Sequence, residues 1–145
     1  MRQRKITIWH IFFILYCAVM LWLLFDREGY DPALPYTEQL RYSLIPFRTT
    51  RRFLKLLLSA NIAYRNQAVI NLGGNVIMFI PLGFFLPRVF PALRNFWLTI
   101  FATALIIIAV ELTQLFTLLG TCDIDDLILN VIGAVIGYGA HTLIK

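Results

Sequence analysis

Charge is scarce in this sequence: only 14% of its residues are Asp, Glu, Lys or Arg, whereas 59% are hydrophobic. A soluble domain of 145 residues would need more polar surface to cover its core. The charged residues are also unevenly distributed, and they leave long stretches with almost no charge. These deficits exclude an ordinary soluble domain and place the chain among membrane proteins.

The sequence also lacks the residue patterns of several common functional sites. Cys17 lies inside an apolar run and Cys122 lies in a loop, so the two differ in membrane depth and no disulfide framework is expected. The C-x-x-C spacing of a metal site is absent as well. The sequence contains no Ser/His/Asp set, no His-rich cluster, no Gly-rich phosphate loop and no nucleic-acid-binding signature. Internal repeats and low-complexity tracts are absent as well. We therefore interpret residues 1–145 as a single domain that does not bind nucleic acid.

Four apolar runs are long enough to cross a hydrocarbon core of ~30 Å as helices. They occupy residues 6–25, 69–87, 96–118 and 124–144. No small-residue cleavage site follows the first run, which we interpret as a retained span rather than a signal peptide. The expected fold is an all-α membrane protein with four transmembrane helices and a long first loop, residues 26–68.

The long first loop contains an amphipathic segment. Arg51, Arg52 and Lys55 share one narrow sector of a helical wheel, and Phe and Leu fill most of the other positions between residues 51 and 60. This pattern is typical of a helix that lies in the membrane interface, near anionic headgroups. An interfacial helix is therefore expected between the first and second spans.

Basic residues predict which side of the membrane each end faces. Arg2, Arg4 and Lys5 precede the first span, Arg88 and Arg94 lie in the turn after the second, and the last turn has no Lys or Arg. The positive-inside rule therefore predicts that both termini are cytoplasmic. The first loop opposes this orientation, since it holds seven of the thirteen basic residues. Long loops count less in the positive-inside rule, and an interfacial helix that contacts anionic headgroups would explain why this loop is basic.

Polar side chains of the spans are expected to gather at one membrane surface. The second and fourth spans begin, and the third ends, on the same side as the long basic loop. Glu111 lies about 10 Å inside its span, where an unpaired carboxylate is costly, so it should face a polar partner or a wet cavity. The residues expected to converge are Asn71, Asn75, Glu111, Gln114, Asp123, Asp126 and Asn130.

Some of these residues also have a purely structural interpretation. Asp123 and Asp126 stand where they would cap the fourth helix and complement its positive end. Asn71 and Asn75 would bond between helices, at ~0.6 kcal/mol or somewhat more per hydrogen bond. The sequence alone does not decide between a site and structural hydrogen bonding.

The fourth span carries a stripe of small and polar residues on one face. Gly133 and Gly137 continue the line of Asp126 and Asn130, and small residues at this spacing let another helix approach closely. Asp125 points away from this stripe, so it is expected to cap or contact the loop. The helix should therefore pack through its glycines and open a polar pocket at its acidic end.

Four motifs occur in order along the chain: LIPF at residues 44–47, NLGGNVIMFIPLGFFLP at 71–87, ELTQLF at 111–116 and DIDDLILNVIGAVIGY at 123–138. Together they resemble the VanZ-like membrane proteins, whose founding member is a teicoplanin resistance protein. The resemblance implies a multi-pass protein of the bacterial cell membrane, linked to low-level glycopeptide resistance. Family members often carry an Arg shortly before D-x-D-D, where this chain has LLGTC. Either Arg48 supplies that charge or the site is altered.

Three functions remain open at this point. The favoured one is a non-enzymatic protein whose outward-facing pocket binds a lipid or cell-wall-precursor headgroup, with loop arginines at the phosphate. The second is an intramembrane enzyme acting on a lipid-linked substrate, with Glu111 as acid/base and with Asp123 and Asp126 holding Mg²⁺ or Ca²⁺. The third is a structural module. Catalysis ranks below binding because the chain has no recognised catalytic set.

Overall fold

Long helices dominate the computed structural model, which describes residues 8–25, 31 and 33–144. Those that are long and apolar enough to cross a membrane are α1 (Ile8–Phe25), α4 (Ile62–Val89), α5 (Phe96–Thr117) and α6 (Ile124–Leu143). The predicted all-α membrane fold with four spans is confirmed. Arg2, Arg4 and Lys5, which predicted the orientation, lie outside the described residues.

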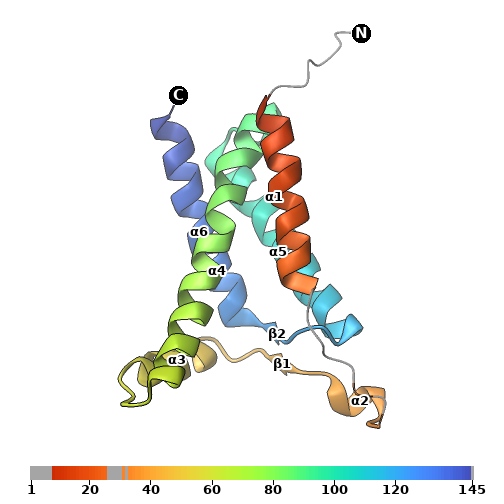
Figure 1. Cartoon of the computed structure of the whole chain (residues 1–145). Helices are drawn as coiled ribbons and strands as arrows, with labels where there is room; N and C mark the ends of the chain where they lie inside the picture. Colours follow the sequence, from red (N-terminus) through yellow and green to blue (C-terminus); the bar gives the residue numbers. More distant parts are fainter. Residues whose placement is uncertain (1–7, 26–30, 32, 145) are drawn as a thin grey trace.

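The four spans form an up-and-down bundle with two distinct ends (Figure 1). α1 begins and α6 finishes at one of them, together with η1 (Pro91–Leu93), and we call this the terminal end. The opposite end, called the loop end, carries α2 (Tyr36–Gln39), β1 (Tyr42–Ser43), α3 (Arg48–Leu57) and β2 (Cys122–Asp123). Both ends of the described chain therefore lie on one side of the bundle, as four spans require.

Helix α4 begins earlier than its apolar run suggested. The predicted start was residue 69, but the helix already begins at Ile62, where Asn61 Oδ1 accepts a hydrogen bond from Ala63 N at 2.9 Å. Residues 62–68, which were predicted to belong to the loop, are therefore helical, and the start of the span itself at residue 69 stays a prediction. The early turns carry Arg65 and other polar residues, so they form a helix without forming a hydrophobic run. The helix also continues through Pro81 without a break.

Helices α4 and α6 approach each other closely through glycines. A Cβ atom added at Gly133 would stand 2.1 Å from Val76 O, and one at Gly137 would stand 1.9 Å from Ile80 O. Gly83 of α4 makes the reciprocal approach, 2.0 Å from a backbone oxygen of α6. Any side chain at these positions would push the two helices apart, so this contact fixes how the bundle is assembled.

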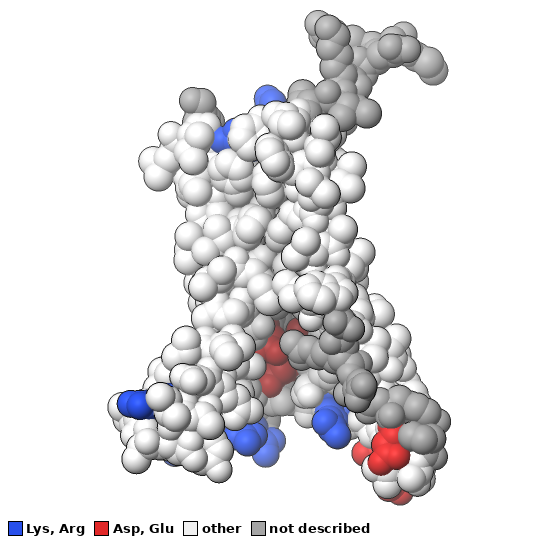
Figure 2. All heavy atoms as spheres, viewed as in Figure 1, with Lys and Arg blue, Asp and Glu red and all other residues white. Residues whose placement is uncertain are grey.

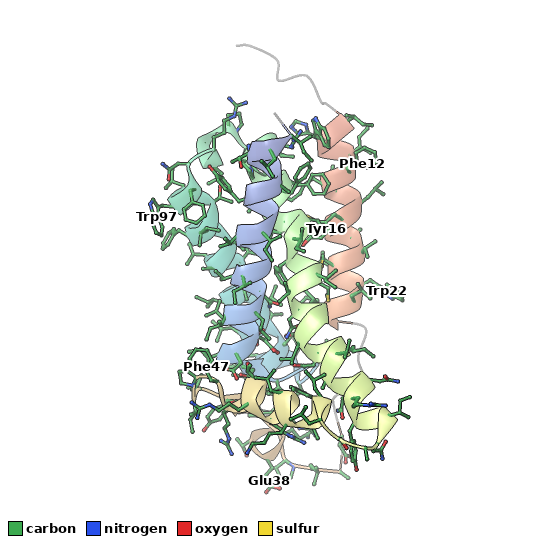
Figure 3. All side chains as sticks on the ribbon, turned by 90° about the vertical axis from the view of Figure 1, so that its left-hand side faces the viewer. Phe12, Tyr16, Trp22, Glu38, Phe47 and Trp97 are labelled. Carbon is green, nitrogen blue, oxygen red and sulfur yellow. The ribbon has the colours of Figure 1, made fainter. Side chains whose placement is uncertain are left out.

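The bundle is apolar on its outside as well as in its core. Buried Met20, Phe79, Leu82, Leu86 and Ile107 form the core cluster. Trp22 and Trp97 point away from it, as Figure 3 shows, and are 62% and 74% exposed. Lipid covers such side chains in a membrane protein, so the exposed belt fits spans that cross a bilayer.

At the loop end, the first loop is tied to the turn between α5 and α6. β1 pairs in parallel with β2, with Tyr42 opposite Cys122, and Cys122 N donates to Arg41 O at 3.0 Å. The amphipathic segment of this loop forms α3, which exposes Arg51, Arg52 and Lys55. That α3 lies in a membrane interface stays a prediction.

Candidate functional site

A cavity of about 710 Å³ opens at the loop end, between α3, α4, α5 and the start of α6. We call it the loop-end cavity. Figure 2 shows acidic side chains recessed between the helices at this end and basic side chains nearer its tip. The residues predicted to converge all line it, and so does Arg48: Arg48, Asn71, Asn75, Glu111, Gln114, Asp123, Asp126 and Asn130.

Asp123 closes the first turn of α6 and also reaches α3. Its Oδ1 accepts a hydrogen bond from Asp125 N at 2.9 Å, which makes it the N-cap of α6. Its Oδ2 accepts a hydrogen bond from Thr49 Oγ1. The side chain is only 5% exposed. The structural interpretation of Asp123 as a cap therefore holds, and the same carboxylate forms part of the cavity wall.

Asp125 caps a different helix from its own. It is 1% exposed, and its two oxygens accept hydrogen bonds from Phe47 N and, at 2.8 Å, from Thr50 N. These N–H groups belong to the start of α3, where no intrahelical acceptor is available. Figure 3 shows Phe47 beside the start of α6. The predicted contact of Asp125 with the loop is confirmed, and it fixes α3 at the edge of the cavity.

The remaining polar residues link separate helices across the cavity wall. Glu111 of α5 is 7% exposed, and its Oε2 accepts a hydrogen bond from Asp123 N at 3.0 Å. Asn75 Nδ2 of α4 donates to Asp126 Oδ1 of α6. Gln114 Nε2 of α5 donates to the last turn of α1 at 2.8 Å. Buried Glu111 thus has the polar partner that its depth requires.

Two amide oxygens of the cavity wall accept no hydrogen bond from the part of the chain that the structure describes. These are Asn71 Oδ1 and Asn130 Oδ1, both buried, and the whole Asn130 side chain is only 4% exposed. A buried polar atom without a partner costs about 1–3 kcal/mol. A water molecule or a ligand group that donates hydrogen bonds would satisfy these two oxygens. The loop-end cavity is the place where that group would enter.

The rim of the cavity is basic, and the sequence revealed only part of it. Arg41 and Arg52 line the cavity along with Arg48, and all three side chains are exposed. Arg52 was predicted to face lipid headgroups, while nothing in the sequence marked Arg41. The pairing of β1 with β2 brings Arg41 to the rim, and strands of two residues leave no periodic signal.

The cavity wall offers hydrogen-bonding and charged side chains. Residues 8–25, 31 and 33–144 contain no group of three or more His, Cys, Asp or Glu side chains placed to hold a metal ion. A Mg²⁺ or Ca²⁺ ion held by Asp123 and Asp126 stays a prediction. Burial, followed by the charges of Glu111 and Asp123, raises the pKa of the nearby Cys122 thiol. That thiol is therefore protonated at neutral pH and a poor nucleophile.

Comparison with known proteins identifies the family. The sequence profile of the VanZ/LLP1 family matches residues 13–145, which is essentially the whole chain. Comparisons with curated proteins and with solved structures give no match. The chain belongs to the VanZ/LLP1 family, so the resemblance carried by its four motifs is confirmed.

Proposed function

We propose that this VanZ-like membrane protein binds the headgroup of a lipid, or of a lipid-linked cell-wall precursor, in the loop-end cavity. The observation that carries the proposal is the separation of charge across the cavity. Exposed Arg41, Arg48 and Arg52 stand at the rim, whereas carboxylates and amides line the wall. A ligand that matches this order has a phosphate at one end and hydroxyl or amine groups at the other.

Each half of such a ligand would find suitable partners. Guanidinium groups bind phosphate oxygens through paired, charge-assisted hydrogen bonds. Hydroxyl or ammonium groups would donate to Asp126 and to the amide oxygens of Asn71 and Asn130, which have no partner among the residues described. These contacts would offset the cost of burying the two amides.

The size and the place of the cavity also support a lipid headgroup. Small-molecule sites occupy about 300–1,000 Å³, and this cavity measures about 710 Å³. It opens where the apolar spans α4 and α5 reach one end of the bundle, at the level where headgroups would lie. The basic face of α3 would strengthen contact with anionic lipid around it.

The proposed consequence for the cell depends on orientation. With both termini cytoplasmic, the loop end faces outward. A cell-wall precursor bound there would change what a glycopeptide meets at the membrane surface. We therefore propose a contribution to low-level tolerance of glycopeptides such as teicoplanin, without chemical change of the precursor.

Two neighbouring arginines of α3 provide the test. Arg52 lines the cavity, whereas Arg51 is exposed on the same helix and does not. The protein is purified in mild detergent, mixed with a polar lipid extract of a bacterial membrane, and analysed by native mass spectrometry. The wild type and Arg51→Gln should retain a lipid of defined mass, and Arg52→Gln should lose most of it.

Two results would overturn the proposal. One is the same amount of bound lipid in Arg51→Gln and Arg52→Gln. An equal loss would mean that general attraction of α3 to anionic lipid accounts for the binding, and full retention by both would mean that Arg52 does not contribute to it. The other is conversion of the bound lipid over time into a species of lower mass. Such turnover would favour the alternative function, an enzyme acting on a lipid-linked substrate.

A further inference from the structure

A second cavity, of about 480 Å³, opens at the terminal end of the bundle. We call it the terminal-end cavity. It shares no residue with the loop-end cavity, from which the length of the bundle separates it. Its basic and aromatic lining residues are Trp9, Arg88, Arg94, Tyr138 and His141.

The charged side chains that line this cavity among the described residues are all basic. All eight acidic residues of the chain lie within positions 26–38 and 111–126, and those that the structure describes belong to the loop end. Among the described residues, no Asp or Glu lines the terminal-end cavity, whereas two arginines do. Figure 2 likewise shows basic but no acidic side chains at this end on the face in view. The cavity therefore attracts an anion, and no carboxylate side chain in the described part of the chain competes for its arginines.

Arg88 is held in place before any ligand binds. Its guanidinium carbon lies 4.5 Å from the ring centre of Trp9 and 4.3 Å from that of Phe84. Its Nη2 donates to Ile144 O, while its Nε has no hydrogen-bond partner in the described part of the chain. Stacking on two rings restricts the side chain without using its N–H donors. A guanidinium held in this way loses little conformational entropy when it binds an anion.

Arg94 and the aromatic residues complete the cavity. Tyr138 Oη donates to Arg94 O at 2.8 Å, which holds the turn after η1 against α6. The Arg94 side chain itself is exposed at the rim. Trp9 and Tyr138 stand at the ends of their spans, where aromatic residues concentrate at the level of lipid headgroups. The cavity thus places two arginines at the depth of a lipid phosphate.

We propose that the terminal-end cavity binds the phosphate of an anionic glycerophospholipid, of which phosphatidylglycerol is the probe. The helices that form the cavity are long and apolar enough to cross a membrane, so the proposed ligand is a membrane lipid rather than a soluble phosphate. Because none of the acidic side chains that the structure describes lines this cavity, they offer an ammonium headgroup no partner there. The site therefore prefers phosphatidylglycerol to phosphatidylethanolamine.

Native mass spectrometry of the full-length protein, titrated with each lipid, tests this proposal. Arg94→Gln is the deciding variant because its side chain is exposed and its carbonyl contact with Tyr138 survives the change. It should weaken phosphatidylglycerol binding about fivefold, the effect of one arginine at a lipid surface, and Arg88→Gln should weaken it at least as much. Arg65→Gln, an exposed arginine at the loop end, should leave this binding unchanged.

The controls distinguish a specific lipid site from a loss of folding and from a site for soluble phosphate. Thermal melting of Arg94→Gln should match the wild type, and glycerol phosphate at the same concentration should not displace the lipid. Wild-type binding by Arg94→Gln would overturn the proposal, and so would an equal loss in Arg65→Gln. Displacement by glycerol phosphate, or equal binding of phosphatidylethanolamine, would also contradict it.

Discussion

At the loop end, carboxylates, amides and arginines from four helices share one cavity, whereas at the terminal end arginines stand among aromatic rings. Helices α4 and α6 line both cavities. α4 contributes Asn75 to one cavity and Arg88 to the other, and α6 contributes Asp126 and Tyr138. At the loop end the polar groups bind one another and so fix α3, β1 and β2. At the terminal end Arg88 stacks on two rings and donates to a backbone carbonyl, and no described acidic side chain lines the cavity.

The two ends also differ in what stabilises them. Long-range hydrogen bonds such as those of Asp125 hold the loop end. Ring contacts hold the terminal end, for example between Trp9 and Phe84 at 5.9 Å and between Phe96 and Tyr138 at 5.3 Å. A substitution that disturbs the helix packing between the two ends should therefore destabilise both ends. A substitution within the hydrogen bonds of one end or the ring contacts of the other should affect that end alone.

The largest effect is expected from Gly137→Leu, which should abolish both cavities. A Cβ at this position would stand 1.9 Å from Ile80 O and 2.9 Å from Phe84 N, so α4 and α6 would have to separate. The variant should give little protein in the membrane fraction and no monodisperse peak in size-exclusion chromatography. Gly139→Leu is the matched control, since a Cβ there would meet nothing within 4 Å. Similar yields for the two variants would contradict the close packing of α4 on α6.

A smaller and local effect is expected from Asp125→Asn. Asn has one oxygen where Asp has two, so only one of the two backbone hydrogen bonds at the start of α3 keeps its acceptor. The other N–H, which is partly buried, loses its partner at a cost of about 1–3 kcal/mol. Hydrogen exchange should quicken in residues 47–57 and stay unchanged around Arg88. Glu38→Gln, an acidic residue exposed on α2, is the control. Faster exchange at both ends would show that the loop end and the terminal end are not independent.

The spans and most of the polar wall were predictable because they depend on local patterns. Apolar runs of about 20 residues indicate transmembrane helices, and the alternating direction of the spans brings Asn75, Glu111 and Asp126 to one surface. The start of α4 was not predictable from hydropathy, because its early turns contain Arg65, Asn66 and Gln67. Helix formation there follows from the Asn61 cap and from continuation of the span, which a hydropathy window does not detect.

Other features depend on contacts between distant segments, which a single sequence does not show. Gly133 and Gly137 predicted a close helix partner, but Gly83 on that partner became recognisable only when α4 and α6 were seen together. Arg41 reaches the rim through the pairing of β1 with β2. Asp125 was expected to contact the loop, yet its role as the cap of α3 required the position of that helix.

The central claim is that the charge of the loop-end cavity binds a headgroup, and Asp126→Asn tests it most directly. Asn has the same size, and its Oδ1 can still accept the hydrogen bond from Asn75, so expression and thermal melting should match the wild type. The negative charge is lost, and the second carboxylate oxygen becomes an NH2 donor. Native mass spectrometry in the presence of a bacterial polar lipid extract should then show wild-type Asp126 protein with a bound lipid and Asp126→Asn with that lipid largely absent. Wild-type levels of the bound lipid in a folded Asp126→Asn protein would contradict the account and leave the loop-end carboxylates with a structural role alone.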